Sequence, residues 1–260
     1  MENVVEKERL DLVLKNTLAI LSRFTAVPNS LGRSGNLRDN TDFHSLLGSL
    51  RKENPDAFGA LYDSAQSSVV LDNIFTSGEV PKTVAELLGV EIEELSNSGH
   101  IQRMDAPKDT RNLYGWHQEI SYYPQNRDGT NGLVVWIPML DVPSDGGALV
   151  IAKESHKEGF VRVASKKDSK LSSTQNLIDE TILEKYEQIK TPAKAGDAVV
   201  MYMTTIHKSS NNETDRFRFV AIGRYHIATS DDFTPYRYNY FNNRWIENNL
   251  KKEGWDVSDL

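Results

Sequence analysis

The apolar positions in the first hundred residues follow a mostly helical pattern. Between Leu10 and Leu21 they recur at roughly helical spacing, which predicts an amphipathic helix over the first two dozen residues. This helix is expected to stop near Pro28. From Val27 to Asp42 the chain is rich in Gly, Ser and Asn, so this stretch is expected to form an exposed connection.

Helical patterns resume after this connection, and residues 1–98 are expected to form a mostly helical N-terminal part. Proline in the first turn is compatible with a helix, because the missing N–H has no partner there in any case. The expected helices carry Phe43 to Leu50 behind a cap at Thr41 or Asp42, and then cover Pro55 to Leu71 and Pro81 to Leu88.

From about residue 99 the pattern changes to short apolar runs separated by Gly, Pro, Asn and Asp. Several short strands at such spacing predict a β-sandwich or barrel, here over residues 99–228. The clearest runs are Gly132 to Leu140, Ala148 to Ala152, Asp197 to Met203 and Arg216 to Ile227.

Two other segments complete the expected organisation. Residues 166–190 are polar and then helix-like, so they are expected to form a helical insertion beside the site. Residues 229–260 carry Trp245 and Trp255, and this tail is expected to pack on the core. Residues 1–260 are therefore expected to form a single catalytic domain.

Composition narrows the classes of function. The chain has 260 residues, a mass of 29.4 kDa, a net charge of -7 and a pI near 5.4. It has no basic excess to displace counterions from phosphates, which argues against nucleic acid as a partner. No stretch resembles a signal peptide or a membrane span, so a cytoplasmic monomer or homodimer without a membrane partner is expected. The sequence contains no cysteine, which leaves any metal to His, Asp, Glu and water.

The candidate chemistry centres on His117, Glu119 and His207. Alternate residues of an extended strand point to the same side, so His117 and Glu119 can bind one ion, and His207 supplies a second imidazole. Two imidazoles and one carboxylate leave open positions for a co-substrate and dioxygen. This arrangement suits non-haem Fe(II) and indicates an oxygenase.

Several motifs follow one another between about residues 100 and 227. They are Trp116-His-Gln-Glu119 with Tyr122-Tyr-Pro124, Gly132-Leu-Val-Val-Trp-Ile-Pro-Met-Leu-Asp141, Asp145-Gly-Gly-Ala-Leu149, Ser155-His-Lys-Glu-Gly159, Ala195-Gly-Asp-Ala-Val-Val200, and His207-Lys-Ser-Ser-Asn-Asn212 followed by Arg218. In these residues and in their order the chain resembles the phytanoyl-CoA dioxygenase family of Fe(II)- and 2-oxoglutarate-dependent oxygenases.

This resemblance implies a double-stranded β-helix core, of the jelly-roll or cupin-like kind, flanked by N-terminal helices. It implies that His117, Glu119 and His207 bind Fe(II), and that Arg218 pairs with the distal carboxylate of 2-oxoglutarate. Periodicity alone does not separate Arg218 from Arg216, because both are expected on one face of a strand.

Further residues are candidates for the co-substrate. Ser209 resembles a serine that helps to hold 2-oxoglutarate, and its alternative role is that of a turn hydroxyl. Trp136 can pack against the co-substrate or serve only as a core aromatic. Gln102 and Arg103 could reach 2-oxoglutarate or substrate, and surface placement is the alternative.

Four histidines are left out of the expected metal site. His156 resembles a structural turn histidine of the family, and His226 is expected in the core or at the pocket rim. Neither His44 nor His100 lies in a supporting motif.

The reaction implied by the resemblance converts 2-oxoglutarate and O2 into succinate and CO2 and hydroxylates a small or medium organic substrate. The family more often has Asp at the position of Glu119, and retention of a carboxylate favours hydroxylation over halogenation. The alternatives are desaturation, epimerisation or ring formation at the same metal site, a non-oxidative cupin-like metal protein or isomerase, and a catalytically silent relative. The acidic composition disfavours a heavily anionic substrate unless local clusters such as Arg237 with Arg244 override it.

Overall fold

The computed structural model describes residues 1–260 except 33–35, 162, 167–174 and 235–260. The α-helices are α1 (Lys7–Leu21), α2 (Asn29–Gly32), α3 (Thr41–Glu53), α4 (Pro55–Gln66), α5 (Val69–Thr76) and α6 (Glu79–Leu88). The 3-10 helices are η1 (Ile92–Glu94), η2 (Glu119–Ser121), η3 (Ser155–Glu158) and η4 (Glu180–Lys185). The strands are β1 (Leu95–Asp105), β2 (Gly132–Pro138), β3 (Leu149–Ala152), β4 (Ala164–Lys166), β5 (Gln175–Leu177), β6 (Gln188–Thr191), β7 (Val199–Tyr202), β8 (His207–Ser209) and β9 (Arg218–Ile227).

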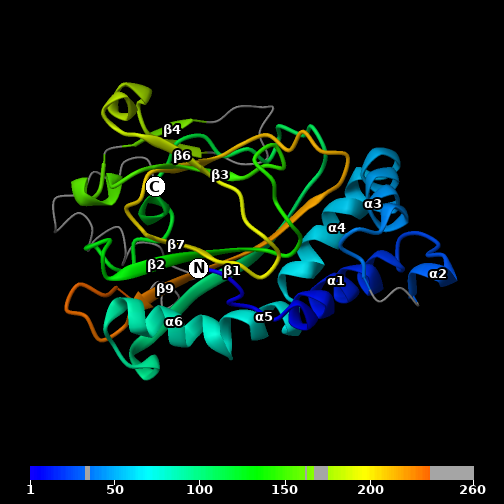
Figure 1. The fold of residues 1–260 in the computed structure, drawn as a ribbon, viewed down its shortest axis with the longest axis horizontal. Coiled ribbons are helices and arrows are strands. Elements are labelled where there is room, and N and C mark those ends of the chain that lie inside the picture. Colours follow the sequence, from blue (N-terminus) through cyan, green and yellow to red (C-terminus); the bar gives the residue numbers. More distant parts are fainter. Residues whose placement is uncertain (33–35, 162, 167–174, 235–260) are drawn as a thin grey trace.

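The described strands form antiparallel sheets, and the helices flank one of them. The larger sheet has the order β1-β9-β2-β7, a second sheet has the order β6-β3-β8, and β4 pairs with β5. Figure 1 shows α1, α5 and α6 below the larger sheet and β3 and β6 above it. The expected combination of a helical N-terminal part and a β core is confirmed at this level.

The helical predictions hold in outline and differ at their ends. The cap of α3 is Asn40, one residue earlier than expected, and its side chain accepts a hydrogen bond from the Phe43 N–H at 3.1 Å. The single helix expected from Pro55 to Leu71 is two helices, because Ser68 caps a new helix by accepting from the Leu71 N–H.

The connection between α1 and α3 is less exposed than expected. It contains the short helix α2, and Leu31 and Leu37 are both buried against the main apolar core. The turn-forming composition therefore did not reveal these two anchoring leucines.

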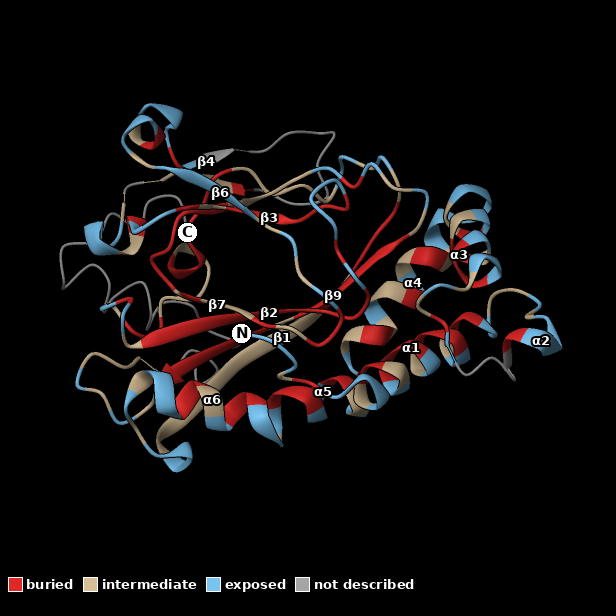
Figure 2. Ribbon diagram, viewed as in Figure 1, coloured by how far each residue is buried: buried red, intermediate tan, exposed pale blue. Residues whose placement is uncertain are grey.

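Side chains of the central strands alternate between two apolar cores. From β9, Phe219 and Tyr225 join the core that the sheet shares with helices α1 and α3–α5, whereas Val220 joins the core between the two sheets. From β2, Val135 faces the helices and Trp136 faces the second sheet. Because both faces are covered, β2 is buried along its whole length and β9 along most of its own, as Figure 2 shows.

Two local predictions are corrected by the structure. The stretch from His117 to Glu119 is not a strand: His117 forms an isolated bridge, and Glu119 begins η2. The predicted helical insertion at 166–190 contains β5, the 3-10 helix η4 and β6 in its described part. Of the tail, residues 235–260, which include Arg237, Arg244, Trp245 and Trp255, lie outside the described residues.

None of the helices that the structure describes could cross a lipid bilayer, given their length and polarity.

The contact between helix α5 and strand β9 yields a stability prediction. A Cβ added at Gly223 would lie 2.4 Å from Cδ1 of Phe75, so a methyl group cannot fit without displacing the ring or the strand. We expect Gly223→Ala to lower the free energy of unfolding by about 1–3 kcal/mol, measured by denaturant titration.

Gly59→Ala is the matched control, because a Cβ at Gly59 in α4 meets no atom within 4 Å. Alanine favours a helix interior over glycine by up to about 1 kcal/mol, so this variant should be neutral or more stable. Equal stability of Gly223→Ala and the unmodified protein would contradict the packing described for this contact.

Candidate active site

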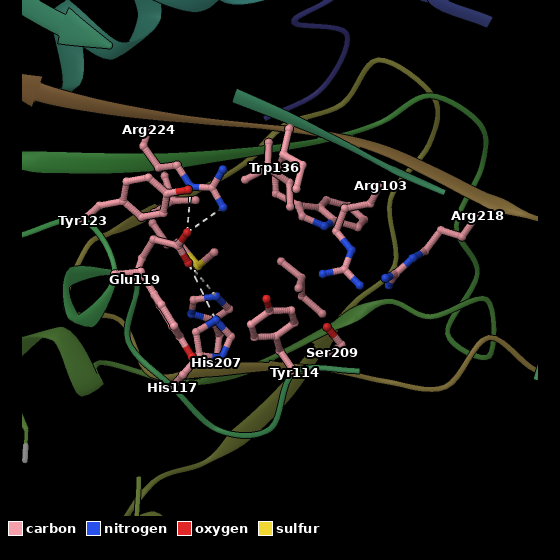
Figure 3. Close-up of a pocket in the computed structure, with 16 residues that line it drawn as sticks. Arg103, Tyr114, His117, Glu119, Tyr123, Trp136, His207, Ser209, Arg218 and Arg224 are labelled. Atoms are coloured by element: carbon pink, nitrogen blue, oxygen red, sulfur yellow. Dashed lines mark hydrogen bonds and ion pairs between the residues drawn. The ribbon is translucent and has the colours of Figure 1, made fainter. Parts of the chain in front are cut away.

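A cavity of about 150 Å³ lies between the two sheets, and all of the predicted site residues except Gln102 line it. The larger sheet contributes side chains from β1, β2, β7 and β9, and the smaller sheet contributes them from β3 and β8. The segment from Tyr114 to Tyr123 supplies the remaining wall. Figure 3 shows the histidines and Glu119 at one end of this cavity and Arg218 at the other.

At the first end, His117, Glu119 and His207 offer ligand atoms that all lie within 4.8 Å of one another. The two histidines come from distant segments joined by a β-bridge, in which each backbone N–H donates to the other residue's carbonyl at 3.0 Å. Their ring centroids are 4.2 Å apart. The three side chains therefore meet although the stretch around Glu119 is not a strand.

The hydrogen bonds of the two imidazoles leave one nitrogen of each ring available. Nδ1 of His117 is 2.7 Å from the carbonyl of Gly115, and Nδ1 of His207 is 2.9 Å from the carbonyl of Thr205. A carbonyl only accepts, so Nδ1 carries the proton and Nε2 keeps its lone pair. Burial, together with the neighbouring His117, lowers the pKa of His207 to about 3, which keeps this ring neutral.

Glu119 directs one oxygen to each of two partners. Its Oε1 accepts a hydrogen bond from Nε of Arg224 at 2.7 Å and forms an ion pair with Nη2 at 2.6 Å. Its Oε2 lies 3.6 Å from Nε2 of His117 and 3.8 Å from Nε2 of His207. Burial by itself would raise the pKa of Glu119, but the charge of Arg224 and the contacts with His117 and His207 together lower it below its usual range, so the carboxyl is ionised.

These donors fit a metal ion. The distances from Oε2 to the two Nε2 atoms exceed hydrogen-bond length, so the three atoms face a shared point without bonding to one another. Two neutral imidazoles and one carboxylate on one side of an ion suit Fe(II) and leave other coordination positions open.

The other end of the cavity holds a cluster of Arg103, Asp105 and Arg218, in which Asp105 and Arg218 are buried and Arg103 is half-buried. Arg218 donates from Nε to Oδ2 of Asp105 at 3.0 Å and also bonds the carbonyl of Gly147. Arg103 donates from Nη2 to Oδ1 at 2.8 Å, and its guanidinium lies over the ring of Tyr114. Burial opposes ionisation of Asp105, yet the two arginines lower its pKa to about 2.

The other residues predicted to bind the co-substrate differ in whether they line the cavity. Ser209, Trp136 and Arg103 line the cavity with Arg218. Gln102 does not: it lies on the opposite face of β1, where its amide donates to Oγ1 of Thr17 at 2.8 Å. The alternation of side chains along β1 explains why its neighbour Arg103 reaches the cavity and Gln102 faces the helices.

Arg216 lies outside the cavity. It pairs with Asp39 at 2.6 Å and bonds the carbonyl of Asp141 at 3.2 Å, and it precedes β9 rather than sharing the face of Arg218. Of the two arginines that periodicity did not separate, only Arg218 borders the cavity.

The four remaining histidines have other environments and do not line the cavity. His156 lies in η3 beside Tyr202, and His226 is buried between Ser98 and Asn126. His44 accepts from the Phe217 N–H, and His100 faces Asp72.

Arg224, Asp105 and Tyr114 were not singled out from the sequence. Arg224 lies six positions after Arg218 on one strand, and Asp105 lies two after Arg103, so alternation along a strand could have placed both on cavity faces. No pattern in the sequence indicated that Arg224 pairs with Glu119, since that contact joins two distant segments. Tyr114, 5.4 Å from the ring of His117, also lay outside any recognised motif.

Fold and site together define an antiparallel β core with two imidazoles and a carboxylate around one possible metal position. A model of the phytanoyl-CoA dioxygenase family matches residues 2–220. The chain belongs to this family, as its motifs indicated. Family membership and the His-Glu-His cluster support the predicted use of Fe(II) and 2-oxoglutarate.

Solved structures share the fold at low sequence identity. A non-heme monooxygenase, ThoJ in its apo form, is 18% identical over 86% of this chain and 72% of its own, with a TM-score of 0.56. The epimerase SnoN from nogalamycin biosynthesis is 16% identical over 88% and 76%, with a TM-score of 0.53. EctD from S. alaskensis, in its apoform, is 15% identical over 87% and 71%, with a TM-score of 0.55. Among curated proteins, none matches this sequence.

The ligand geometry predicts that His207→Ala weakens metal binding at least about 100-fold. Loss of a residue that only hydrogen-bonds a metal ligand typically weakens binding about 10–100-fold, and loss of the ligand itself should cost more. Anaerobic calorimetry with Fe(II) measures this effect directly.

His156→Ala is the matched control, because it removes another imidazole, one that packs beside Tyr202 and lies outside the His-Glu-His cluster. Its Fe(II) affinity should equal that of the unmodified protein. If His207→Ala binds Fe(II) as tightly as His156→Ala does, His207 is not a ligand.

Proposed function

We propose that this protein is an Fe(II)- and 2-oxoglutarate-dependent dioxygenase in which His117, Glu119 and His207 hold the iron. The observation that carries this proposal is that one cavity has a His-Glu-His cluster at one end and the buried guanidinium of Arg218 at the other. We also propose that residues 1–260 act as one catalytic domain and that the two sheets facing the cavity form the double-stranded β-helix of this family.

The second end of the cavity suits the distal carboxylate of 2-oxoglutarate. Arg218 is buried and its plane is fixed by Asp105, so its donors are oriented before the ligand arrives. Arg103 adds a second guanidinium, Ser209 adds a hydroxyl and Trp136 an apolar wall. A planar fork of N–H donors matches a carboxylate better than an ammonium group does.

When bound, Fe(II) and 2-oxoglutarate would activate O2 for the oxidation of the substrate, with succinate and CO2 as co-products. The chain's own residues hold the ligands and limit access of water. Tyr122 contributes to this wall, and burial raises its pKa to about 12, so it stays a neutral hydroxyl.

Hydroxylation of a small or medium organic molecule is the outcome that we propose. The second candidate is another outcome at the same metal site, namely desaturation, epimerisation or ring formation. One neighbour in fold is an epimerase and another a monooxygenase, so both kinds of chemistry occur on this architecture.

The proposed activity predicts slow formation of succinate from 2-oxoglutarate in the presence of Fe(II) and O2, without added substrate. Mass spectrometry of succinate follows the reaction, and a substrate found in a metabolite panel should accelerate it. His207→Ala should form none. Sustained absence of succinate from the iron-loaded protein, with and without the metabolite panel, would reject this function.

The proposed role of Arg218 predicts that Arg218→Lys raises the KM for 2-oxoglutarate more than about tenfold, because one ammonium cannot form the two-pronged pair. Steady-state succinate formation gives this constant.

The control is Arg216→Lys, which changes an arginine outside the cavity in the same way. It should leave the KM unchanged. If Arg216→Lys raises the KM and Arg218→Lys does not, Arg216 and not Arg218 binds 2-oxoglutarate. Thermal melts of both variants identify any loss of folding.

A further inference from the structure

Arg224 is held in one orientation beside the proposed metal position. Its side chain is 9% exposed, its Nε donates to Oε1 of Glu119, and its Nη2 forms an ion pair with the same oxygen. The guanidinium also lies over the ring of Tyr123, 4.5 Å from its centroid. Contacts at one edge and one face therefore fix the direction of the remaining nitrogen, Nη1.

Nη1 of Arg224 has no hydrogen-bond partner among the described residues, although it is buried. A buried donor without an acceptor costs free energy, more so when it carries charge, and native proteins rarely leave one. Arg224 lines the cavity, and Figure 3 shows it across from Arg218. The residue that carries the open donor thus lines the proposed site.

The charge of the cavity indicates what this donor would bind. Among the described residues, three guanidinium groups line the cavity, those of Arg103, Arg218 and Arg224, and the carboxylates that pair with them are Asp105 and Glu119. One positive charge remains. A divalent iron and a doubly charged 2-oxoglutarate cancel each other, so this positive charge persists in the loaded site. Burial of an unbalanced charge is costly, and one further negative charge would remove it.

We propose that Arg224 is a second anion-binding residue of the cavity, whose free Nη1 group binds a carboxylate of the molecule that is oxidised. This proposal rests on the proposed function and narrows its substrate to compounds with one carboxylate near the reacting carbon. The two carboxylates of 2-oxoglutarate already have proposed partners, the iron and Arg218. The free Nη1 group could instead bind the carboxylate of 2-oxoglutarate that lies at the iron, and the experiment distinguishes this case from binding of a substrate carboxylate.

The test compares acids with amides of the same skeleton, namely benzoate with benzamide, phenylacetate with phenylacetamide, and hexanoate with hexanamide. Each is titrated into protein saturated with Mn(II) and 2-oxoglutarate, so that no turnover occurs, and binding is followed by calorimetry and thermal shift. We expect at least one acid to bind about tenfold more tightly than its amide, since a charge-assisted bond is lost with the charge.

In Arg224→Lys the affinity for the acid divided by that for the amide should fall close to one. The single lysine nitrogen can pair with Glu119, and no further nitrogen remains to bind the carboxylate of the ligand. Arg224→Gln removes the charge and should give the same result. The ratio is taken within each variant at saturating Mn(II), so weaker metal binding alone does not change it. Arg216→Lys, outside the cavity, should keep the preference of the unmodified protein.

Three outcomes would overturn the proposal: no acid binds better than its amide, the preference persists in both Arg224 variants, or Arg216→Lys loses it equally. A large loss of 2-oxoglutarate affinity in Arg224→Lys, with no acid preference in any variant, would assign Nη1 to the co-substrate instead. Failure of the dioxygenase assignment would appear separately, as absence of succinate formation in the unmodified protein.

Discussion

The alternation of side chains along β9 is the constraint on which the fold and the site both depend. Phe219 and Tyr225 pack into the helix-covered core, whereas Arg218 and Arg224 point into the cavity between the sheets. A shift of one residue would exchange the two sets and bury the arginines among the helices. The pairing of β9 with β1 also brings Asp105 opposite Arg218, so strand register delivers the counter-ion together with the cation.

Buried charges in this cavity are stable because each carboxylate has an arginine. Asp105 bonds both Arg103 and Arg218, and Glu119 accepts a hydrogen bond from Nε of Arg224 and pairs with its Nη2. Pairing lowers the pKa of both carboxyl groups against the effect of burial. The whole chain carries a net charge of -7, yet the groups at the cavity leave a positive balance. Global acidity is therefore a poor guide to the charge of a ligand bound here, because local fields dominate at contact distance.

The two histidines are presented by the same local arrangement from two distant segments. In each, Nδ1 bonds a carbonyl two residues earlier, and the two backbones join in a bridge. Such backbone contacts restrict the rings before any ion binds. Glu119 gains a comparable restraint from Arg224, since one of its oxygens accepts from the arginine while the other faces the imidazoles.

The sequence by itself indicated the helical N-terminal part and the strands after residue 130, because apolar periodicity is a local property, and its motifs proposed His117, Glu119 and His207 as one set. Tertiary structure decided which face of each strand became the cavity: it turned Arg103 inward and Gln102 toward Thr17, and it selected Arg218 over Arg216. It also brought Arg224 to Glu119. Periodicity along a strand predicts that neighbouring side chains point to opposite faces, but it does not predict what packs against each face. The packing depends on contacts between segments far apart in the chain.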